Sequence, residues 1–398
     1  MKKNDWHAYL MRDVLERVEV PVNVEPDKEY VQIGIRSHGK GLFYKEPVLG
    51  KALGNKQVFW IQPNCFILNV VFAWEQAITK TTENEIGMIG SHRFPMYRPK
   101  NDLVDIDYLI YYFLTKRGTD ILEAASPGGA GRNRTLGQER FLKSKITLPP
   151  LSEQQKIATI LSTQDKVIEL KEKLLAQKQQ QKKYLMQQLL TGKKRLPGFG
   201  SEWKTIHLNE ISCRIETKNT VGNNNALTIS AQYGLINQTE FFDKVIASDD
   251  KSNYYLLSKD EFAYNRSYSK GYPYGTIKRL KRYNQGIVSP LYICFAVNKK
   301  LASFDFLEQY FEASIINREI RSIVQEGARN HGMLNVAVDD FFRIKITMPE
   351  IEEQKEISEI LSTADHEIDL LQKSIEAEKQ KKKALMQLLL TGKVRVKI

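Results

Sequence analysis

The chain of 398 residues lacks a long apolar run, a leader-like start and any pair of cysteines at metal-binding or redox spacing. Its longest strongly apolar run, residues 65–74, covers ten positions, whereas a membrane-spanning helix needs about 20. No apolar segment follows the lysines at the start, so no signal peptide is expected and the cytoplasm is the default location. The cysteines lie too far apart for a disulfide framework and are expected to be small core residues: Cys65, Cys213 and Cys294.

Motifs that carry catalysis are also missing. Residues 34–41 nearly match the phosphate-binding loop GxxxxGK[ST], but Gly41 stands where the magnesium-binding hydroxyl belongs, so a basic loop is the favoured interpretation. The six histidines are scattered, and no hydrolase elbow or methyltransferase Pro-Pro-aromatic motif occurs. We therefore predict that the chain is not an enzyme by itself, with no catalytic residue, no metal site and no cofactor of its own.

Acidic residues are fewer than basic ones, which gives a net charge of +12 and a pI near 9.3. Half of this excess lies in residues 152–195, which carry ten basic and four acidic side chains. A basic chain suits a polyanionic partner such as nucleic acid, although charge that serves solubility alone would give the same total.

The sequence contains an internal duplication at an offset of 200 residues. Residues 141–195 and 341–395 are identical at 28 of 55 positions without a gap. The order is variable block, repeat, variable block, repeat, which predicts a pseudo-twofold molecule of four segments: residues 1–148, 149–195, 196–348 and 349–398.

Each repeat predicts one long helix. Ser152 to Gln155 resembles a capping box, and neither proline nor glycine follows until Gly192, which gives about 58 Å of helix at 1.5 Å per residue. Apolar residues recur by sevens, which indicates an antiparallel coiled coil between the two copies. The alternative is two separate helices, each packed on its own domain. The predicted seam, interrupted in both copies by a lysine, consists of Leu161, Ile168, Leu175, Lys182 and Leu189 and of Leu361, Ile368, Ile375, Lys382 and Leu389.

The variable blocks mix strand and helix signals, so we expect two α/β or α+β domains. Residues 30–33, 65–72 and 291–297 are predicted strands, whereas residues 106–115 and 304–324 are predicted helical. The blocks share faint features that indicate one fold used twice. These features are an early tryptophan (Trp6, Trp203), a Phe-x-x-Asn motif (66–69, 262–265) and a glycine-rich loop with an Arg-Asn pair (131–134, 327–331).

Basic and aromatic residues mark candidate DNA contacts. Residues 262–304 contain no acidic residue but hold eight basic residues and six tyrosines, a composition suited to phosphates and base edges. The candidates there are Arg266, Ser267, Tyr268, Lys270, Tyr272, Lys278, Arg279, Lys281 and Arg282. Weaker candidates in the first block, which plain surface charge explains equally well, are Arg36, His38, Lys40, Arg93 and Arg98. The glycine-rich loops add Arg132, Arg134 and Arg329, which either touch DNA or cap the junction with the long helix.

The repeated segments resemble the central and C-terminal conserved regions of type I restriction–modification specificity subunits. The resemblance rests on Leu-Pro-Pro-Leu-Ser-Glu-Gln-Gln-Lys-Ile at 148–157, on Ile-Leu-Ser-Thr-x-Asp, and on the Leu-Met-Gln-x-Leu-Leu-Thr-Gly-Lys endings. The second copy, at 349–354, fits although its helix start lacks the Ser/Thr cap. The order of blocks matches over the whole chain.

This resemblance implies two target-recognition domains that each read half of a bipartite DNA site, and a coiled coil that sets their spacing. It further implies docking of two methyltransferase (modification) subunits, which bind S-adenosylmethionine, and of two restriction subunits, which use ATP and Mg. Since the two variable blocks differ, the DNA site should be asymmetric. Two alternatives stay open: a stand-alone sequence-specific DNA-binding regulator, which would bind tightly without partners, and a coiled-coil adaptor without salt-dependent DNA affinity.

Overall fold

The chain folds into two compact units that each combine one variable block with parts of both long helices. Unit 1 comprises Met1–Glu172 and Ser374–Ile398, and unit 2 comprises Lys173–Lys373. The computed structural model describes residues 5–128, 134–230, 233–242, 251–268, 271–325 and 333–397. No helix in these ranges is long and apolar enough to cross a membrane.

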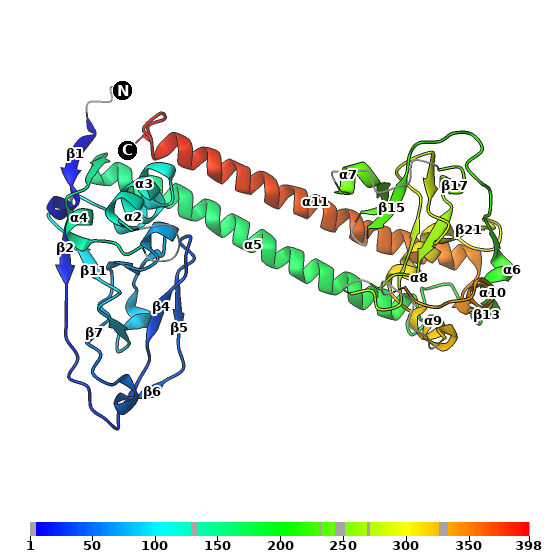
Figure 1. Cartoon of the computed structure of the whole chain (residues 1–398), viewed down its shortest axis with the longest axis horizontal. Helices are drawn as coiled ribbons and strands as arrows, with labels where there is room; N and C mark the ends of the chain where they lie inside the picture. The colour runs from blue at the N-terminus through cyan, green and yellow to red at the C-terminus, as the bar shows by residue number, and fades with distance from the viewer. Residues whose placement is uncertain are drawn as a thin grey trace. The chain divides into compact units, whose positions relative to one another are not determined.

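Unit 1 builds its variable block from short antiparallel strands and four small helices (Figure 1). A four-stranded sheet has the order β2-β11-β8-β9, and β1 pairs with β12 directly before the long helix. The strands are β1 (His7–Leu10), β2 (Leu15–Val18), β3 (Glu29–Tyr30), β4 (Ile33–Ile35), β5 (Leu42–Tyr44), β6 (Val48–Leu49), β7 (Val58–Trp60), β8 (Phe66–Leu68), β9 (Ile78–Lys80), β10 (Ile89–Ser91), β11 (Met96–Pro99) and β12 (Lys145–Leu148). The helices are α1 (Met11–Val14), α2 (Ile106–Phe113), α3 (Lys116–Ala125) and α4 (Gln138–Leu142), with 3-10 turns η2 (Gly50–Leu53), η3 (Ala73–Glu75) and η4 (Glu83–Glu85).

Unit 2 repeats this plan with different loops. Its four-stranded sheet has the order β14-β21-β18-β19, and β13 pairs with β22 before the second long helix. The strands are β13 (Lys204–His207), β14 (Ser212–Arg214), β15 (Leu227–Ser230), β16 (Gly234–Asn237), β17 (Tyr255–Ser258), β18 (Phe262–Asn265), β19 (Thr276–Arg279), β20 (Gln285–Val288), β21 (Ile293–Val297) and β22 (Lys345–Met348). The helices are α6 (Leu208–Ile211), α7 (Gln238–Phe242), α8 (Phe304–Glu312), α9 (Asn317–Ile323) and α10 (Val338–Phe342).

Each core joins the strand–helix layer to the ends of both long helices. In unit 1, Phe66 stacks on Phe113 and Phe141, and the same core takes in Leu161 and Leu389. In the corresponding core of unit 2, Phe262 stacks on Phe295 and Phe341 packs at a tilt against Phe295, and the same core takes in Leu189 and Leu361. The end of one repeat therefore packs against the beginning of the other repeat.

The two repeats form the predicted long helices α5 (Leu151–Leu189) and α11 (Ile351–Leu389), which pack together antiparallel. In unit 1, Lys382 binds Asp165 across the pair, and in unit 2 Lys182 binds Asp365. The lysines that interrupt the apolar heptads are thus partners in cross-helix ion pairs. Of the predicted seam, Leu161, Leu189, Leu361, Ile375 and Leu389 are buried, while Ile168, Leu175 and Ile368 are half-buried.

The helix ends are anchored identically in both units. Gly192 and Gly392 both have φ +68°, a left-handed conformation that favours glycine, and each lies against a tryptophan ring, Trp203 or Trp6. Beyond each glycine an arginine makes a bidentate pair with a buried glutamate at the start of the opposite helix. Arg195 donates to Glu353 at 2.7 and 2.8 Å, and the corresponding pair in unit 1 is Arg395 with Glu153.

Several sequence predictions were wrong in detail. The predicted N-cap, Ser152, lies inside α5, and Gln154 instead fastens the helix start by donating to the carbonyls of Leu103 and Pro149. The helix predicted over 304–324 breaks into α8 and α9 at Ser314, whose φ is +59°. Cys213 is exposed, whereas Cys65 and Cys294 lie in the core as expected.

Candidate nucleic-acid interface

The Phe-x-x-Asn motif positions one loop in each unit by the same hydrogen bonds. In unit 1 the side chain of Asn69 accepts from the amide of Val71 at 3.0 Å. The carbonyl of Val70 accepts from the amide of Leu136 at 2.8 Å. This second bond joins the loop after β8 to the segment that follows the glycine-rich stretch.

Unit 2 reproduces both contacts at equivalent positions. The side chain of Asn265 accepts from the amide of Ser267 at 3.0 Å, and the carbonyl of Arg266 accepts from Leu334 at 2.9 Å. We call the two places the Asn69 loop (residues 69–76 with 134–136) and the Asn265 loop (residues 265–268 and 271–275 with 333–336). Faint sequence similarity thus corresponds to one shared loop scaffold with different side chains.

The Asn69 loop gathers most of the weaker basic candidates of the first block. The loop between β4 and β5, which carries exposed Arg36, His38 and Lys40, is tied to it: the amide of His38 donates to the carbonyl of Glu75 at 2.8 Å. Arg93 is exposed and its carbonyl accepts from Val70. A guanidinium–aromatic contact of 5.4 Å places Arg134 over the ring of Trp74. Basic and aromatic groups therefore converge here as a nucleic-acid surface requires.

Arg98 does not join this group. It lies beside the thiol of Cys65, whose pKa is raised by burial and lowered in part by the Arg98 hydrogen bond. It also lines a hollow with Lys80 and Gln155 at the start of α5. Arg98 is placed at the helix junction rather than at the Asn69 loop.

Several basic residues of the acid-free stretch in unit 2 have acidic partners from other segments. Arg279 is buried and pairs with Asp260, Asp305 and Glu308, while Lys278 pairs with Glu312. The guanidinium of Arg266 donates to the carbonyls of Leu291 and Val336. These side chains hold the domain together, and DNA contact by them stays a prediction.

Other candidates of unit 2 are more accessible. Tyr268 is 64% exposed on the Asn265 loop, next to Ser267. Lys281 and Arg282 are exposed, although they pair with Glu308 and Glu240 at 3.1 and 3.2 Å. Tyr272 donates to Glu312, and burial raises its pKa to about 12.

Three predicted contacts lie outside the described residues: Arg132, Lys270 and Arg329. Among the described residues, no group of three or more histidine, cysteine or carboxylate side chains is placed to hold a metal ion. The near-match to a phosphate-binding loop forms the β4–β5 hairpin, and no helix follows it as nucleotide binding would require.

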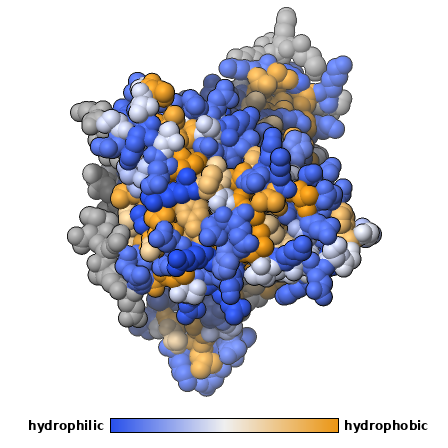
Figure 2. All heavy atoms as spheres, turned by 90° about the vertical axis from the view of Figure 1, so that its right-hand side faces the viewer, coloured by the Kyte–Doolittle hydropathy of each residue, from blue (hydrophilic) through white to orange (hydrophobic). Residues whose placement is uncertain are grey.

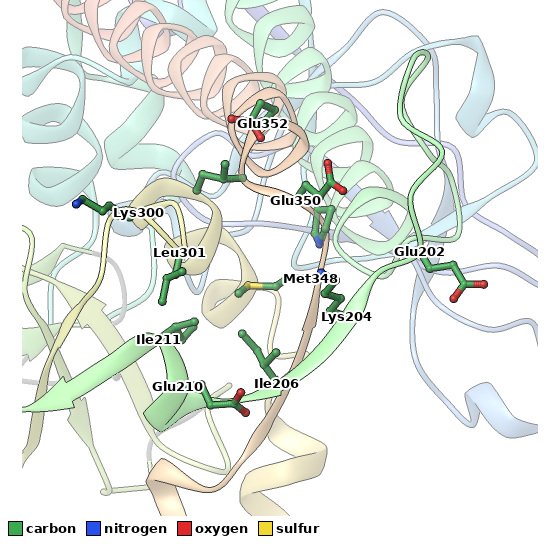
Figure 3. Close-up of a pocket in the computed structure, with 12 residues that line it drawn as sticks. Glu202, Lys204, Ile206, Glu210, Ile211, Lys300, Leu301, Met348, Glu350 and Glu352 are labelled. Atoms are coloured by element: carbon green, nitrogen blue, oxygen red, sulfur yellow. The ribbon is translucent and has the colours of Figure 1, made fainter.

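Unit 2 also carries a groove of a different character. It measures about 430 Å³ beside β13 and the start of α11, and Figure 3 shows Ile206, Ile211, Leu301 and Met348 around its centre. Its rim holds four carboxylates and two lysines: Glu202, Glu210, Glu350, Glu352, Lys204 and Lys300. Apolar residues also gather on the face of unit 2 in Figure 2. An acidic rim disfavours DNA phosphates and suits contact with protein.

The two halves of the chain both match one family model. The family described as the type I restriction modification DNA specificity domain matches residues 25–180 and again residues 200–379. The chain belongs to this family of specificity subunits. The expectation drawn from the conserved helix motifs is thereby confirmed, and so is the α+β fold of two recognition domains with two long paired helices.

Relatives and solved structures agree with this assignment. The MjaVIII specificity subunit of Methanocaldococcus jannaschii is 27% identical over 336 residues, which is 75% of this chain and 72% of that protein. The HsdS subunit from Thermoanaerobacter tengcongensis matches with a TM-score of 0.57 at 17% identity and covers 98% of both chains. The S subunit from M. genitalium matches with a TM-score of 0.54 at 14% identity and also covers 98% of both chains. These structures are similar in fold.

The sequence alone does not identify every residue of the candidate interface. Trp74 supports Arg134, yet in the sequence it is one apolar residue among several. In the sequence, Asn69 and Asn265 belong to a shared Phe-x-x-Asn motif that suggests no role for them. In the structure, their side chains accept the hydrogen bonds that hold the two loops. Glu308 and Glu312 of α8 pair with basic side chains of the acid-free stretch but lie outside that stretch in the sequence. Their effect on its charge is therefore visible only in the fold.

Proposed function

We propose that this specificity subunit is a non-catalytic reader of an asymmetric bipartite DNA sequence. Unit 1 reads one half through the Asn69 loop and the basic β4–β5 hairpin. Unit 2 reads the other half through the Asn265 loop. The side chains offered to base edges are Arg36, His38, Lys40, Arg93 and Arg134 in unit 1, and Ser267, Tyr268, Lys281 and Arg282 in unit 2.

One observation carries the proposal: the two loops share a scaffold but not their side chains. Asn69 and Asn265 make the same hydrogen bond, but the loop of unit 1 carries Trp74 with Arg134 over its ring, whereas the loop of unit 2 carries exposed Tyr268. A shared scaffold with different chemistry is what two readers of different half-sites need. Arginine, serine and tyrosine can all bond to base edges or phosphates.

The paired helices set the spacing and dock the partners in this account. Each of α5 and α11 has 39 residues, about 58 Å at 1.5 Å per residue, which exceeds one turn of duplex. Two modification subunits bind the scaffold and methylate adenine with S-adenosylmethionine, and restriction subunits add ATP- and Mg-dependent cleavage. The chain itself contributes recognition, and the chemistry lies in these partners.

Two substitutions test half-site reading. Arg134→Ala should relax the half-site of unit 1 and Tyr268→Ala that of unit 2, each at about 1–3 kcal/mol for a lost base contact. The measurement is affinity for duplexes in which one half-site at a time is varied. Exposed Arg12→Ala and Tyr233→Ala are the matched controls and should leave both half-sites intact. Equal loss on all sequences in both variants would contradict base reading by these loops.

A further inference from the structure

A cationic groove lies in unit 1 where the α2–α3 corner meets the C-terminal third of α11. It measures about 530 Å³, and Leu114 and Met386 are among the residues that line it. Five cationic side chains and no carboxylate line it: Lys116, Arg117, Lys379, Lys382 and Lys383. We call these five residues the junction patch.

The charge of the junction patch is only partly balanced. Lys116 pairs with Asp120 at 2.6 Å, Lys379 pairs with Glu172 at 2.7 Å, and Lys382 pairs with Asp165. Arg117 and Lys383 are exposed, and no salt bridge joins either of them to another residue of the described ranges. These two side chains therefore supply the uncompensated positive charge of the groove.

The junction patch continues the candidate DNA surface of unit 1. A Cβ placed on Gly39 would come 2.7 Å from Leu114, so the β4–β5 hairpin lies directly on the edge of the groove. The side chain of Gln76 donates to Thr119 of α3 at 2.6 Å, which fastens the Asn69 loop to the same corner. His38 and Lys40 thus stand next to the patch on one connected surface.

Unit 2 lacks this feature at the equivalent place. Asp105 and Ser303 begin α2 and α8, and each backbone amide donates to a repeat glutamine, Gln154 or Gln354, which aligns the two units. By this alignment Lys116 and Arg117 correspond to Ser314 and Ile315, and Leu114 corresponds to Glu312. The nearby groove of unit 2, between α8 and the start of α11, is lined by four carboxylates and three lysines: Glu308, Glu312, Asp365, Asp369, Lys182, Lys278 and Lys281. Of these two grooves, the one in unit 1 has cationic side chains without carboxylates in its lining, and it therefore suits an anion better.

We propose that the junction patch binds the phosphate backbone of the DNA duplex beside the half-site of unit 1, independently of base sequence. This inference rests on the proposed function, because it assumes that the connected loops face DNA. Lysine and arginine bind phosphate by charge and carry no sequence information. The specificity subunit would therefore hold DNA more strongly at one end than at the other. An acidic helix of a partner protein is the competing occupant, but the continuity with the hairpin favours DNA.

The test measures how affinity depends on salt. Each phosphate contact adds about 0.9 to the slope of log affinity against log salt concentration, so Arg117→Gln with Lys383→Gln should lower the slope by about 1.8. The probes are a duplex that carries the recognised motif and a duplex with both half-sites scrambled, each titrated with the full chain. Lys183→Gln, at the position of α5 equivalent to Lys383, is the matched control and should leave the slope unchanged. Thermal unfolding of each variant checks that the fold is intact.

The outcomes separate this inference from the proposed function. A lower slope on both probes, with an unchanged preference for the motif, supports the phosphate site. An unchanged slope overturns it, and weaker co-purification of a modification subunit in that case would assign the patch to a protein partner. If the unsubstituted chain shows no preference for the motif but the slope still falls, the proposed function fails and the phosphate site stands.

Discussion

At the residue scale, the neighbours of a charged side chain in three dimensions decide what it can do. Arg279 belongs to a stretch without acidic residues, which predicted a DNA contact. The fold brings three carboxylates to its guanidinium and leaves the residue 7% exposed. The pattern of basic residues was visible in the sequence, but their neutralisation was not, because Asp305 and Glu308 come from α8.

Substitution of Arg279 distinguishes a structural role from a DNA contact. Arg279→Ala leaves three carboxylates without their shared cation, and we expect the free energy of unfolding to fall by about 2 kcal/mol. This loss is smaller than for a fully buried ion pair, because the carboxylates are partly exposed. Urea denaturation measures this loss. Exposed Arg282→Ala is the control and should change stability by less than about 0.5 kcal/mol. Unchanged stability of Arg279→Ala together with weaker DNA binding would restore the original prediction.

At the element scale, the helix pair is pseudo-symmetric but not symmetric. In unit 1 the side chains of Lys171 and Gln164 donate to Glu378 at 2.8 and 2.7 Å across the pair, and Lys171 also reaches Ser374. The corresponding positions in unit 2 hold Lys178, Ala364, Leu371 and Leu174. A polar cluster that occurs in only one of the two units can fix the register of the helices and the choice of partner. It therefore favours pairing of α5 with α11 over pairing of either helix with a second copy of itself.

Glu378 makes the polar cluster sensitive to acid. Hydrogen bonds from Lys171 and Gln164 lower the pKa of Glu378 from 4.5 to about 2. Because the pKa of Glu378 is lower in the folded state than in the unfolded state, its ionised carboxylate stabilises the fold. This contribution is fully present above about pH 4.5 and is lost as the pH falls toward 2. The melting temperature should therefore fall more steeply with acid in the unsubstituted chain than in Glu378→Gln. Exposed Glu376→Gln should follow the unsubstituted chain, and parallel curves for all three would contradict this role.

The long helices were the most predictable part of the fold. The long runs without proline or glycine, the heptad repeats and the 28 identities between the two copies predicted that the helices exist, how long they are and that they pair. These properties depend on a periodic pattern that is visible in the sequence. Their starts were less predictable, since Gln154 anchors α5 to residues 49 and 51 positions away in sequence. The short strands of the variable blocks depend on such tertiary contacts throughout, and the strand predicted at 30–33 ends at Tyr30 and resumes at Ile33.

At the scale of the whole molecule, duplication accounts for how one chain could read two different half-sites, as we propose. The repeated segments are identical at 28 of 55 positions, and both make the same anchor, Arg195 with Glu353 and Arg395 with Glu153. The loops between them have diverged. The sequence indicated this division of roles. It did not predict all residues of the Asn69 loop, because Trp74 and Arg134 come into contact only when the chain folds. The division of the chain into four segments at 148, 195 and 348 stays a prediction.

The most direct test of the central claim is a genome-wide map of methylated adenines in cells that carry this gene with its neighbours. The account predicts an asymmetric bipartite motif that disappears when the gene is deleted. In cells whose chain has one heptad added to both helices, the spacer should lengthen by about three base pairs, since seven residues add about 10.5 Å. The same methylated motif in the deleted strain would contradict the account, and an unchanged spacer in the lengthened chain would refute the role of the helices in spacing.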